Sequence, residues 1–345
     1  MLTEMSEIKG LSKAKRLSWF GPQNIISWAY MKRLREHDDT RKVYDINPYV
    51  EVYQFRDNLF GLFNQNCDGA GDVWQWLTVG PEKAFLVDTA FGLGDTRALI
   101  EQYLAPGKEL IVVNTHDHYD HAFGNCRFDR VYCHEALVPL IKEQNSHMWD
   151  YLWNKETGKN KWLEFDKKDL PKFRPYELIG VPDGYTWDLG DGYQIELINS
   201  NGHGGAGASM YLDRRNKILF PGDNICSDIS GCGNISYPLE DCTLYKYRET
   251  VRKLVSRIDE IDWVFPMHFI TDLESRILPA VLEALDSVLA DPEHNYDYII
   301  EQIRSDKGPK WVRYCKYIKG FSVLCYSFVE KAAEPIPAGI AALTK

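Results

Sequence analysis

The sequence has no excess of positive charge. Its 345 residues include 40 Lys and Arg against 50 Asp and Glu, which gives a net charge of −10. Proteins that bind nucleic acids or anionic lipid surfaces usually do so through concentrated Lys and Arg side chains. The acidic balance therefore argues against nucleic-acid and membrane partners, and we expect a small-molecule substrate.

Long apolar runs and paired cysteines are also missing. No run of about 18 apolar residues is present, which argues against a membrane-spanning helix, and residues 1–20 lack the apolar core of a secretory signal. None of the eight cysteines forms a Cys-x-x-Cys pair. We therefore expect reduced thiols, no disulfide framework and a cytoplasmic location. A Gly-x-Ser-x-Gly motif, which would indicate a serine nucleophile, is absent as well.

The patterns that are present predict one α/β domain with additions. Residues 1–47 are predicted to form an N-terminal helical extension, because apolar residues between 25 and 34 recur near the helical period. Residues 48–330 are predicted to form the main domain, with an aromatic-rich insertion over about 134–185, and residues 331–345 a flexible tail. Strands are expected over 50–55, 59–63, 73–79, 84–87, 111–113, 193–198, 209–212, 217–220 and 311–328, and helices over 94–104, 242–258 and 272–289.

Three histidines and an aspartate directly follow one of these strands. Residues 115–121 read Thr-His-Asp-His-Tyr-Asp-His. His116 and His118 are two residues apart, so an extended segment points both side chains the same way. Asp120 and His121 are adjacent where the chain turns, and can diverge toward two neighbouring metals. Imidazole and carboxylate ligands suit zinc, iron or manganese. The alternative interpretation is that these side chains only cap and decorate a loop.

Three further candidate ligands stand at the ends of other expected strands. They are His203 in a Gly-His-Gly turn, Asp223 in a Gly-Asp pair, and His268 in Pro-Met-His. Each of them alone would more often be a structural residue. In this order, and with glycine-rich turns beside two of them, they complement the histidine motif.

The order of these motifs resembles that of the metallo-β-lactamase superfamily. The resemblance covers about residues 48–290, and it extends to Phe85–Thr89, a strand that ends in Asp and a small residue, and to the turn Leu189–Gly192. It implies an α/β fold of the αββα sandwich type, with metals at the ends of two sheets. Asp88 and Asp117 are candidates for orienting the imidazoles through hydrogen bonds.

The resemblance implies a binuclear site for two divalent metal ions, in the first place zinc, with manganese or iron as alternatives. The ligands that it implies are His116, His118 and His203 for the first metal, Asp120, His121 and His268 for the second, and Asp223 as a bridge between them. A hydroxide held between two such ions is a strong nucleophile at neutral pH. Asp120 is the expected catalytic residue, because it could both bind a metal and orient the hydroxide.

The activity that the resemblance implies is hydrolysis of an ester, lactone, thioester or amide. Asp223 stands where the commonest class of true β-lactamases has a cysteine, so the ligand set is more similar to those of glyoxalase II and N-acyl-homoserine lactonases. The acidic charge argues against the tRNA-processing branch of the family. Three alternatives stay open: a non-haem iron oxidoreductase similar to persulfide dioxygenases, a phosphodiester or sulfate-ester hydrolase, and a metal-binding protein without activity.

Two regions outside the resemblance bear on partners. The insertion and the loop 226–242 are natural pocket walls, and an apolar or aromatic part of a substrate could contact the side chains of Trp149, Trp153, Trp162 and Tyr237. These aromatic residues could equally pack the insertion onto the core. The N-terminal extension could pair two protomers in a homodimer.

Overall fold

The computed structural model describes residues 12–18, 25–69, 71–226, 235–237, 243–303, 310–319 and 322–328. The tail expected over 331–345 lies outside these ranges, as does most of the loop 226–242. Among the described residues, no helix is both long enough and apolar enough to cross a bilayer.

The first of the two main sheets has eight strands in the order β10-β8-β7-β6-β5-β4-β3-β2. From β2 to β6 neighbouring strands are antiparallel, whereas β6, β7, β8 and β10 run parallel to one another. The strands are β2 (Lys42–Tyr44), β3 (Asn47–Arg56), β4 (Leu59–Asn64), β5 (Val73–Val79), β6 (Lys83–Val87), β7 (Glu109–Val113), β8 (Arg130–His134) and β10 (Glu177–Val181).

The second main sheet has six strands in the order β11-β12-β13-β14-β16-β17. They are β11 (Thr186–Asp188), β12 (Gln194–Asn199), β13 (Ser209–Asp213), β14 (Ile218–Phe220), β16 (Trp263–Val264) and β17 (Leu273–Glu274). Side chains of both sheets meet in a shared core, in which Trp76 and Phe85 of the first sheet join Tyr211 and Phe220 of the second. Both faces of this interface are apolar, so the two sheets bury each other.

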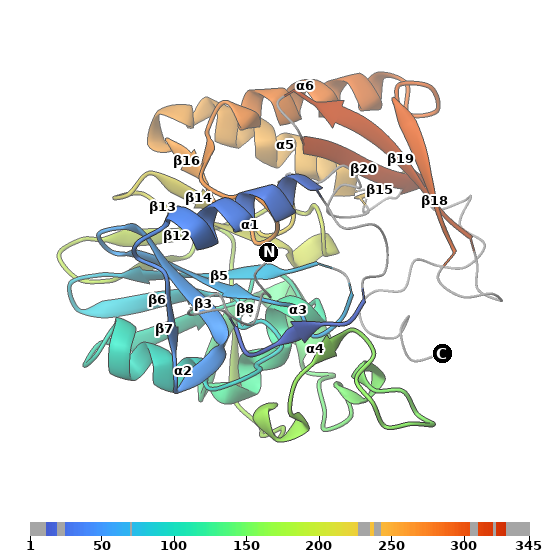
Figure 1. Cartoon of the computed structure of the whole chain (residues 1–345). Coiled ribbons are helices and arrows are strands. Elements are labelled where there is room, and N and C mark those ends of the chain that lie inside the picture. The colour runs from blue at the N-terminus through green and yellow to red at the C-terminus, as the bar shows by residue number, and fades with distance from the viewer. Residues whose placement is uncertain are drawn as a thin grey trace.

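Helices cover the outer faces of the two sheets. The side chains of α5 (Thr243–Ser256) and α6 (Ile277–Ala290) pack on the second sheet, and those of α2 (Thr96–Leu99) and the π-helical turn that continues it, Ile100–Leu104, pack on the first. Figure 1 shows α5 and α6 on one side of the stacked sheets and α2 on the other. The predicted αββα sandwich is therefore confirmed.

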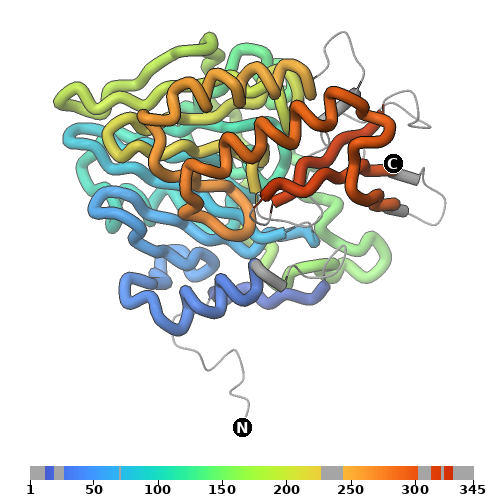
Figure 2. The backbone as a smooth tube through the Cα atoms, turned by 90° about the horizontal axis from the view of Figure 1, so that it is seen from above, coloured from blue at the N-terminus to red at the C-terminus, as the bar shows by residue number. Residues whose placement is uncertain are grey.

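The N-terminal residues attach to the sandwich at two places. Helix α1 (Ile25–His37) is anchored by Arg35, whose guanidinium donates to the buried Glu51 carboxylate with Nη2 2.7 Å from Oε1. Strand β1 (Lys15–Arg16) pairs with β9 (Leu163–Glu164) of the insertion. Figure 2 shows the dark-blue strand beside the light-green insertion.

The aromatic-rich segment between β8 and β10 is mostly irregular. Its short elements are η4 (Glu135–Leu137), α4 (Val138–Ile141), η5 (Asp150–Leu152), β9 and η6 (Lys167–Asp169). The range 134–185 also contains β10, which joins the edge of the first sheet by parallel pairing with β8. The residues that leave the sheet are therefore 135–176.

A third sheet of four strands lies at the C-terminal end, in the order β15-β20-β19-β18. It consists of β15 (Ile235–Tyr237), β18 (Tyr298–Ile303), β19 (Lys310–Ile318) and β20 (Ser322–Phe328). The single strand expected over 311–328 is wrong, because the chain reverses after Ile318 and pairs Cys315 with Cys325 across two antiparallel strands. The six cysteines of the described residues form no disulfide with one another.

We expect Trp76→Ala to destabilise the protein strongly, because Trp76 connects the two sheets. Its ring is fully buried, lies 4.9 Å edge-on from that of Phe265, and its indole Nε1 donates to the Pro266 carbonyl at 3.1 Å. Removing a buried Trp costs about 3–5 kcal/mol. Urea unfolding measures the loss, with Trp28→Ala as the control, because the Trp28 side chain is half exposed and should change stability by only about 0.5 kcal/mol. Equal effects of the two substitutions would contradict the buried position of Trp76.

Candidate metal centre

The candidate ligands come from four strand ends that meet at one edge of the sandwich. His116 and His118 follow β7, and Asp120 and His121 lie in the short helix α3 (Tyr119–Ala122) that comes next. The other three follow strands of the second sheet: His203 follows β12, Asp223 follows β14 and His268 follows β16. The structure thus brings together all seven side chains that the sequence singled out, although they span more than 150 positions of the chain.

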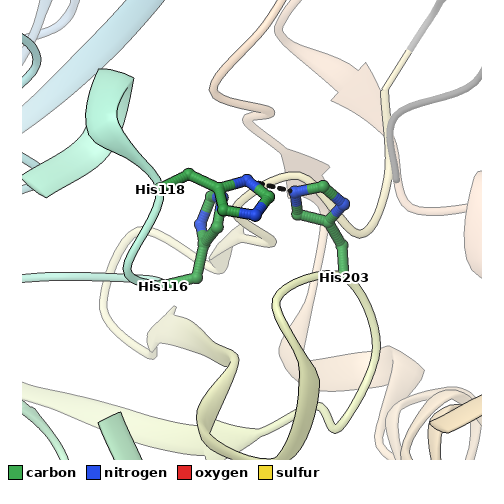
Figure 3. A group of neighbouring side chains, drawn as sticks. All are labelled: His116, His118 and His203. Carbon is green, nitrogen blue, oxygen red and sulfur yellow. Dashed lines mark hydrogen bonds between the residues drawn. The ribbon is translucent and has the colours of Figure 1, made fainter. Parts of the chain in front are cut away.

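Three imidazoles form the first group. His116, His118 and His203 place one ring nitrogen each within 4.8 Å of the others. His203 Nε2 lies 3.0 Å from His118 Nδ1, and Figure 3 shows the three rings turned toward a common point from two facing loops. Three nitrogen donors at this spacing suit a divalent transition metal.

The second group combines a carboxylate with two imidazoles. Asp120, His121 and His268 also converge within 4.8 Å, with His268 Nε2 3.3 Å from Asp120 Oδ2. Asp223 lies between the groups, because its Oδ2 is 3.6 Å from His203 Nε2 on one side and 3.3 Å from His268 Nε2 on the other. This central position is the one that a bridging carboxylate requires.

Three polar atoms of the cluster lack a hydrogen-bond partner within the described part of the chain and are positioned to bind a cation. His116 Nε2, His203 Nδ1 and Asp223 Oδ1 are buried and have no hydrogen-bond partner among the described residues. Buried polar atoms are almost always paired, because an unpaired one costs about 1–3 kcal/mol. Five imidazoles and two carboxylates are also the donor types that zinc, manganese and iron prefer. Cation binding would satisfy these atoms and neutralise the two buried carboxylates.

Burial and mutual repulsion keep two of the imidazoles neutral. Burial lowers the pKa of His116 well below its ordinary value, and the neighbouring His121 and His118 act in the same direction. Burial and His118 also lower the pKa of His203 to about 3. A neutral imidazole is the form that binds a metal, so these two side chains are ready to do so at neutral pH.

The carboxylates and His121 stabilise one another as ions. Burial raises the pKa of Asp120, but the His121 and His268 imidazoles outweigh it and bring the pKa to about 2. Burial lowers the pKa of His121, yet Asp223, Asp120 and Asp88 together raise it to about 10. The carboxylates therefore stay ionised, which is the state that binds metals, and a metal would take the place of the proton on His121.

Asp88 fixes both ends of the ligand segment 115–121. Its carboxylate accepts hydrogen bonds from the Thr115 backbone N–H at 2.7 Å and the Thr115 hydroxyl at 2.8 Å, and its Oδ2 lies 2.8 Å from His121 Nδ1. The contact through Nδ1 directs His121 Nε2 to the centre of the cluster. Asp88 itself has a positive φ of 64°, an uncommon conformation for a residue other than glycine, which the fully buried hydrogen bonds maintain.

The loop that carries His203 depends on glycine. Gly204 has a φ of +85°, and a Cβ atom there would lie 2.7 Å from the Cβ of His116. Asn224, which follows Asp223, accepts a hydrogen bond from the His203 backbone N–H through its Oδ1 at 2.9 Å. Gly204 therefore lets the loop approach β7 closely enough for His203 to join His116.

Residues that the sequence patterns did not single out hold the second group. Asn66 Nδ2 donates to Asp120 Oδ2 at 3.0 Å, and His268 Nδ1 donates to the Asp72 carbonyl at 2.8 Å. Asn66 and Asp72 lie between β4 and β5, and Arg16 contacts the same connection. Its Nη1 donates to the Asp68 carbonyl and its Nη2 to Asp72 Oδ1, both at 2.6 Å. No local motif indicates these contacts, because Arg16 and His268 lie far from the loop in sequence.

The aromatic side chains expected at the pocket wall differ in how deeply they are buried. Trp149 and Trp153 are buried in an apolar cluster, and Trp149 Nε1 donates to the Phe91 carbonyl at 3.2 Å. They pack the insertion onto the core, as the alternative interpretation has it. Trp162 is only half-buried, and the side chain of Tyr237 lies outside the described residues.

The chain belongs to the metallo-β-lactamase superfamily. The family model described as Metallo-beta-lactamase superfamily matches residues 68–268, a range that includes all seven candidate ligands. Two solved structures share the fold. A metallo-beta-lactamase from Pontibacter korlensis is 20% identical with a TM-score of 0.50, and the match covers 69% of this chain and 99% of that one. The DIM-1 metallo-beta-lactamase is 21% identical with a TM-score of 0.51, and the match covers 70% of this chain and 99% of that one.

Among curated proteins, the chain is similar to an acyl-coenzyme A thioesterase named MBLAC2. The Homo sapiens protein is 26% identical over 231 residues, which cover 62% of this chain and 79% of the relative. The Gallus gallus protein is 26% identical over 209 residues, which cover 56% of this chain and 71% of the relative. These relatives and the site place the chain among hydrolases with the metallo-β-lactamase fold.

We expect Asp88→Asn to weaken metal binding by about 10–100-fold, because a side chain that orients metal ligands contributes about that much to affinity. The amide cannot accept from both Thr115 and His121 as the carboxylate does. Competition with a chelator, followed by metal analysis, measures the affinity. Asp57→Asn is the matched control, since Asp57 is exposed. Unchanged metal affinity in Asp88→Asn would contradict this role.

We expect Arg16→Gln to make the metal at the second group dissociate about tenfold more readily, because Asp72 and His268 lose their support. Arg16→Lys should lie in between, since one amine can replace only part of the two-pronged contact. The loss of one metal equivalent during chelator treatment measures the effect. Lys15→Gln, an exposed neighbour, is the control. If both glutamine variants lose metal at the same rate, Arg16 does not position this group.

Proposed function

We propose that this protein is a metal-dependent hydrolase of acyl thioesters that works with two metal ions. The observation that carries the proposal is the convergence of five imidazoles and two carboxylates, with Asp223 central between two three-residue groups. When bound, divalent ions in such a cluster lower the pKa of water and polarise a carbonyl oxygen. The thioester preference is supported by the relatives, which are named acyl-coenzyme A thioesterases.

The residues of the chain have separate tasks in this proposal. Six side chains would hold the ions in two groups. Asp223, which converges with His116 of the first group and His121 of the second, would be shared by both. Asp120, which the Asn66 amide holds at 3.0 Å, directs one carboxylate oxygen inward and can accept a hydrogen bond from the attacking water. His121 is held by Asp88, so its ring cannot turn away.

The reaction balances without any further reactant. Water adds to the thioester carbonyl, a C–O bond forms, and the C–S bond breaks. The products are a carboxylate and a thiol, with the remaining proton released to solvent at neutral pH. No change of oxidation state occurs, so neither oxygen nor an electron carrier is needed.

The central test combines metal analysis with a panel of substrates. We expect two equivalents of zinc or manganese per chain and hydrolysis of acyl thioesters, in preference to lactones, β-lactams, phosphodiesters and sulfate esters. A single iron with oxygen consumption would instead support a persulfide-dioxygenase-like reaction, and would overturn the proposal. Turnover of phosphodiesters or sulfate esters alone would overturn it too.

We expect Asp223→Ala to lower kcat to the background rate, because both groups lose the carboxylate that they share. The fold should persist, since the substitution leaves the sheet cores intact, and circular dichroism with thermal unfolding checks this. Asp262→Asn is the control, because Asp262 is exposed. Asp213 would not serve, because its buried carboxylate accepts a hydrogen bond from the Tyr193 hydroxyl. Retained activity in Asp223→Ala would contradict the role of Asp223 as a ligand shared by both groups.

A further inference from the structure

We propose that a turn of the insertion binds the phosphate groups of the thiol carrier, so that the substrate is an acyl thioester of a phosphorylated nucleotide such as coenzyme A. The turn comprises residues 152–161, and we call it the lysine turn after Lys155, Lys159 and Lys161. The inference rests on the proposed function, because it names the carrier of the thioester that the metal centre would hydrolyse.

The lysine turn has a fixed backbone. Asn154 Oδ1 accepts hydrogen bonds from the backbone N–H groups of Glu156 at 3.0 Å and Thr157 at 2.9 Å, which shape its tip. Its two arms are joined by a backbone hydrogen bond from the Lys161 N–H to the Leu152 carbonyl at 3.0 Å. The lysines of this turn are therefore carried on a preformed support, which lowers the entropy lost when a ligand binds.

The positive charge of the lysine turn is not neutralised. Lys155, Lys159 and Lys161 are exposed, and within the described residues none of them forms an ion pair. By contrast, the nearby Lys13 and Lys168 are paired with Asp169 and Asp166. Three unpaired lysines within seven positions are unusual in a chain with a net charge of −10.

Two of these lysines are close enough to affect each other. Partial burial lowers the pKa of Lys161, and the positive charge of Lys155 lowers it further. A cluster of like charges is unfavourable until an anion binds to it. The geometry of the turn and this repulsion together favour a ligand with several negative charges.

A line of aromatic contacts joins the lysine turn to the metal centre. The ring of His118 stacks at 6.3 Å on Tyr119, which lies 5.8 Å from Tyr151, which in turn lies 5.9 Å from Trp162. Lys161 completes the line, with its Nζ 5.1 Å from the Trp162 ring centre. The insertion that carries the lysine turn therefore packs against the segment that carries His118. Coenzyme A has its thiol and its phosphates at opposite ends of the pantetheine arm.

The test compares one acyl group on two thiols, using the full chain loaded with metal. One substrate is the coenzyme A thioester, and the other is the thioester of N-acetylcysteamine, which has no phosphate. The variant changes Lys155, Lys159 and Lys161 to Gln. The matched control changes three ion-paired lysines elsewhere to Gln, and so alters the net charge equally: Lys32, Lys83 and Lys319.

We expect the lysine-turn variant to raise KM for the coenzyme A thioester about tenfold, which corresponds to about 1.4 kcal/mol, and to leave kcat unchanged. KM for the N-acetylcysteamine thioester should stay the same in the variant and in the control. Higher salt should raise KM for the coenzyme A thioester of the unaltered protein alone. Equal KM changes for both substrates, or none, would overturn the inference.

A binding measurement separates this inference from the proposed function. Adenosine 3′,5′-bisphosphate carries phosphates without a thioester, and calorimetry should show binding to the unaltered protein that weakens about tenfold in the lysine-turn variant. If neither thioester is hydrolysed but this binding is seen, the proposed function fails and the phosphate site stands. If both thioesters are hydrolysed and the bisphosphate does not bind, the phosphate site fails alone. A variant that impairs only acyl carrier protein thioesters would assign the lysines to a protein partner instead, and overturn the proposal.

Discussion

The hydrogen bonds of one buried carboxylate hold the centre of this molecule together. Asp88 stands at the end of β6 and contacts both Thr115 and His121, so it fixes the start and the end of the histidine motif at once. Without this anchor, Thr115 and His121 would lose the hydrogen bonds that fix their positions, and the motif would be a loop at the edge of a sheet. The positive φ of Asp88 is the backbone strain that this arrangement stores, and the surrounding bonds offset it.

The N-terminal residues and the insertion, which lie outside the family resemblance, contact either the segments that carry the candidate metal ligands or a loop that supports them. The N-terminal strand β1 pairs with the insertion, and its Arg16 also supports the loop that His268 contacts. The insertion in turn meets the ligand segment through Tyr151 and Tyr119. Parts of the chain outside the family resemblance thus bear on the position of the candidate ligands and on the space beside them.

Much of the sandwich could be predicted from the sequence, because its strands are buried and therefore strongly patterned. The run expected over 73–79 matches β5 at both ends, and the seven candidate ligands carry local signals such as glycine turns and strand ends. Reversal of the chain after Ile318 was not visible, since alternation continues on both sides of it. The supports Asn66, Asp72 and Arg16 could not be predicted either, because their partners are set by the tertiary fold and not by neighbouring residues.

The sequence positions of these residues also limit when the second group can be completed during synthesis. Arg16 and Asp72 are 56 positions apart, and another 196 positions separate Asp72 from His268. Contacts of such separation form late, since the intervening chain has to be ordered first. The Asp72 carbonyl therefore lacks its imidazole partner until His268 has been synthesised, and the second group can hold a metal only after that point.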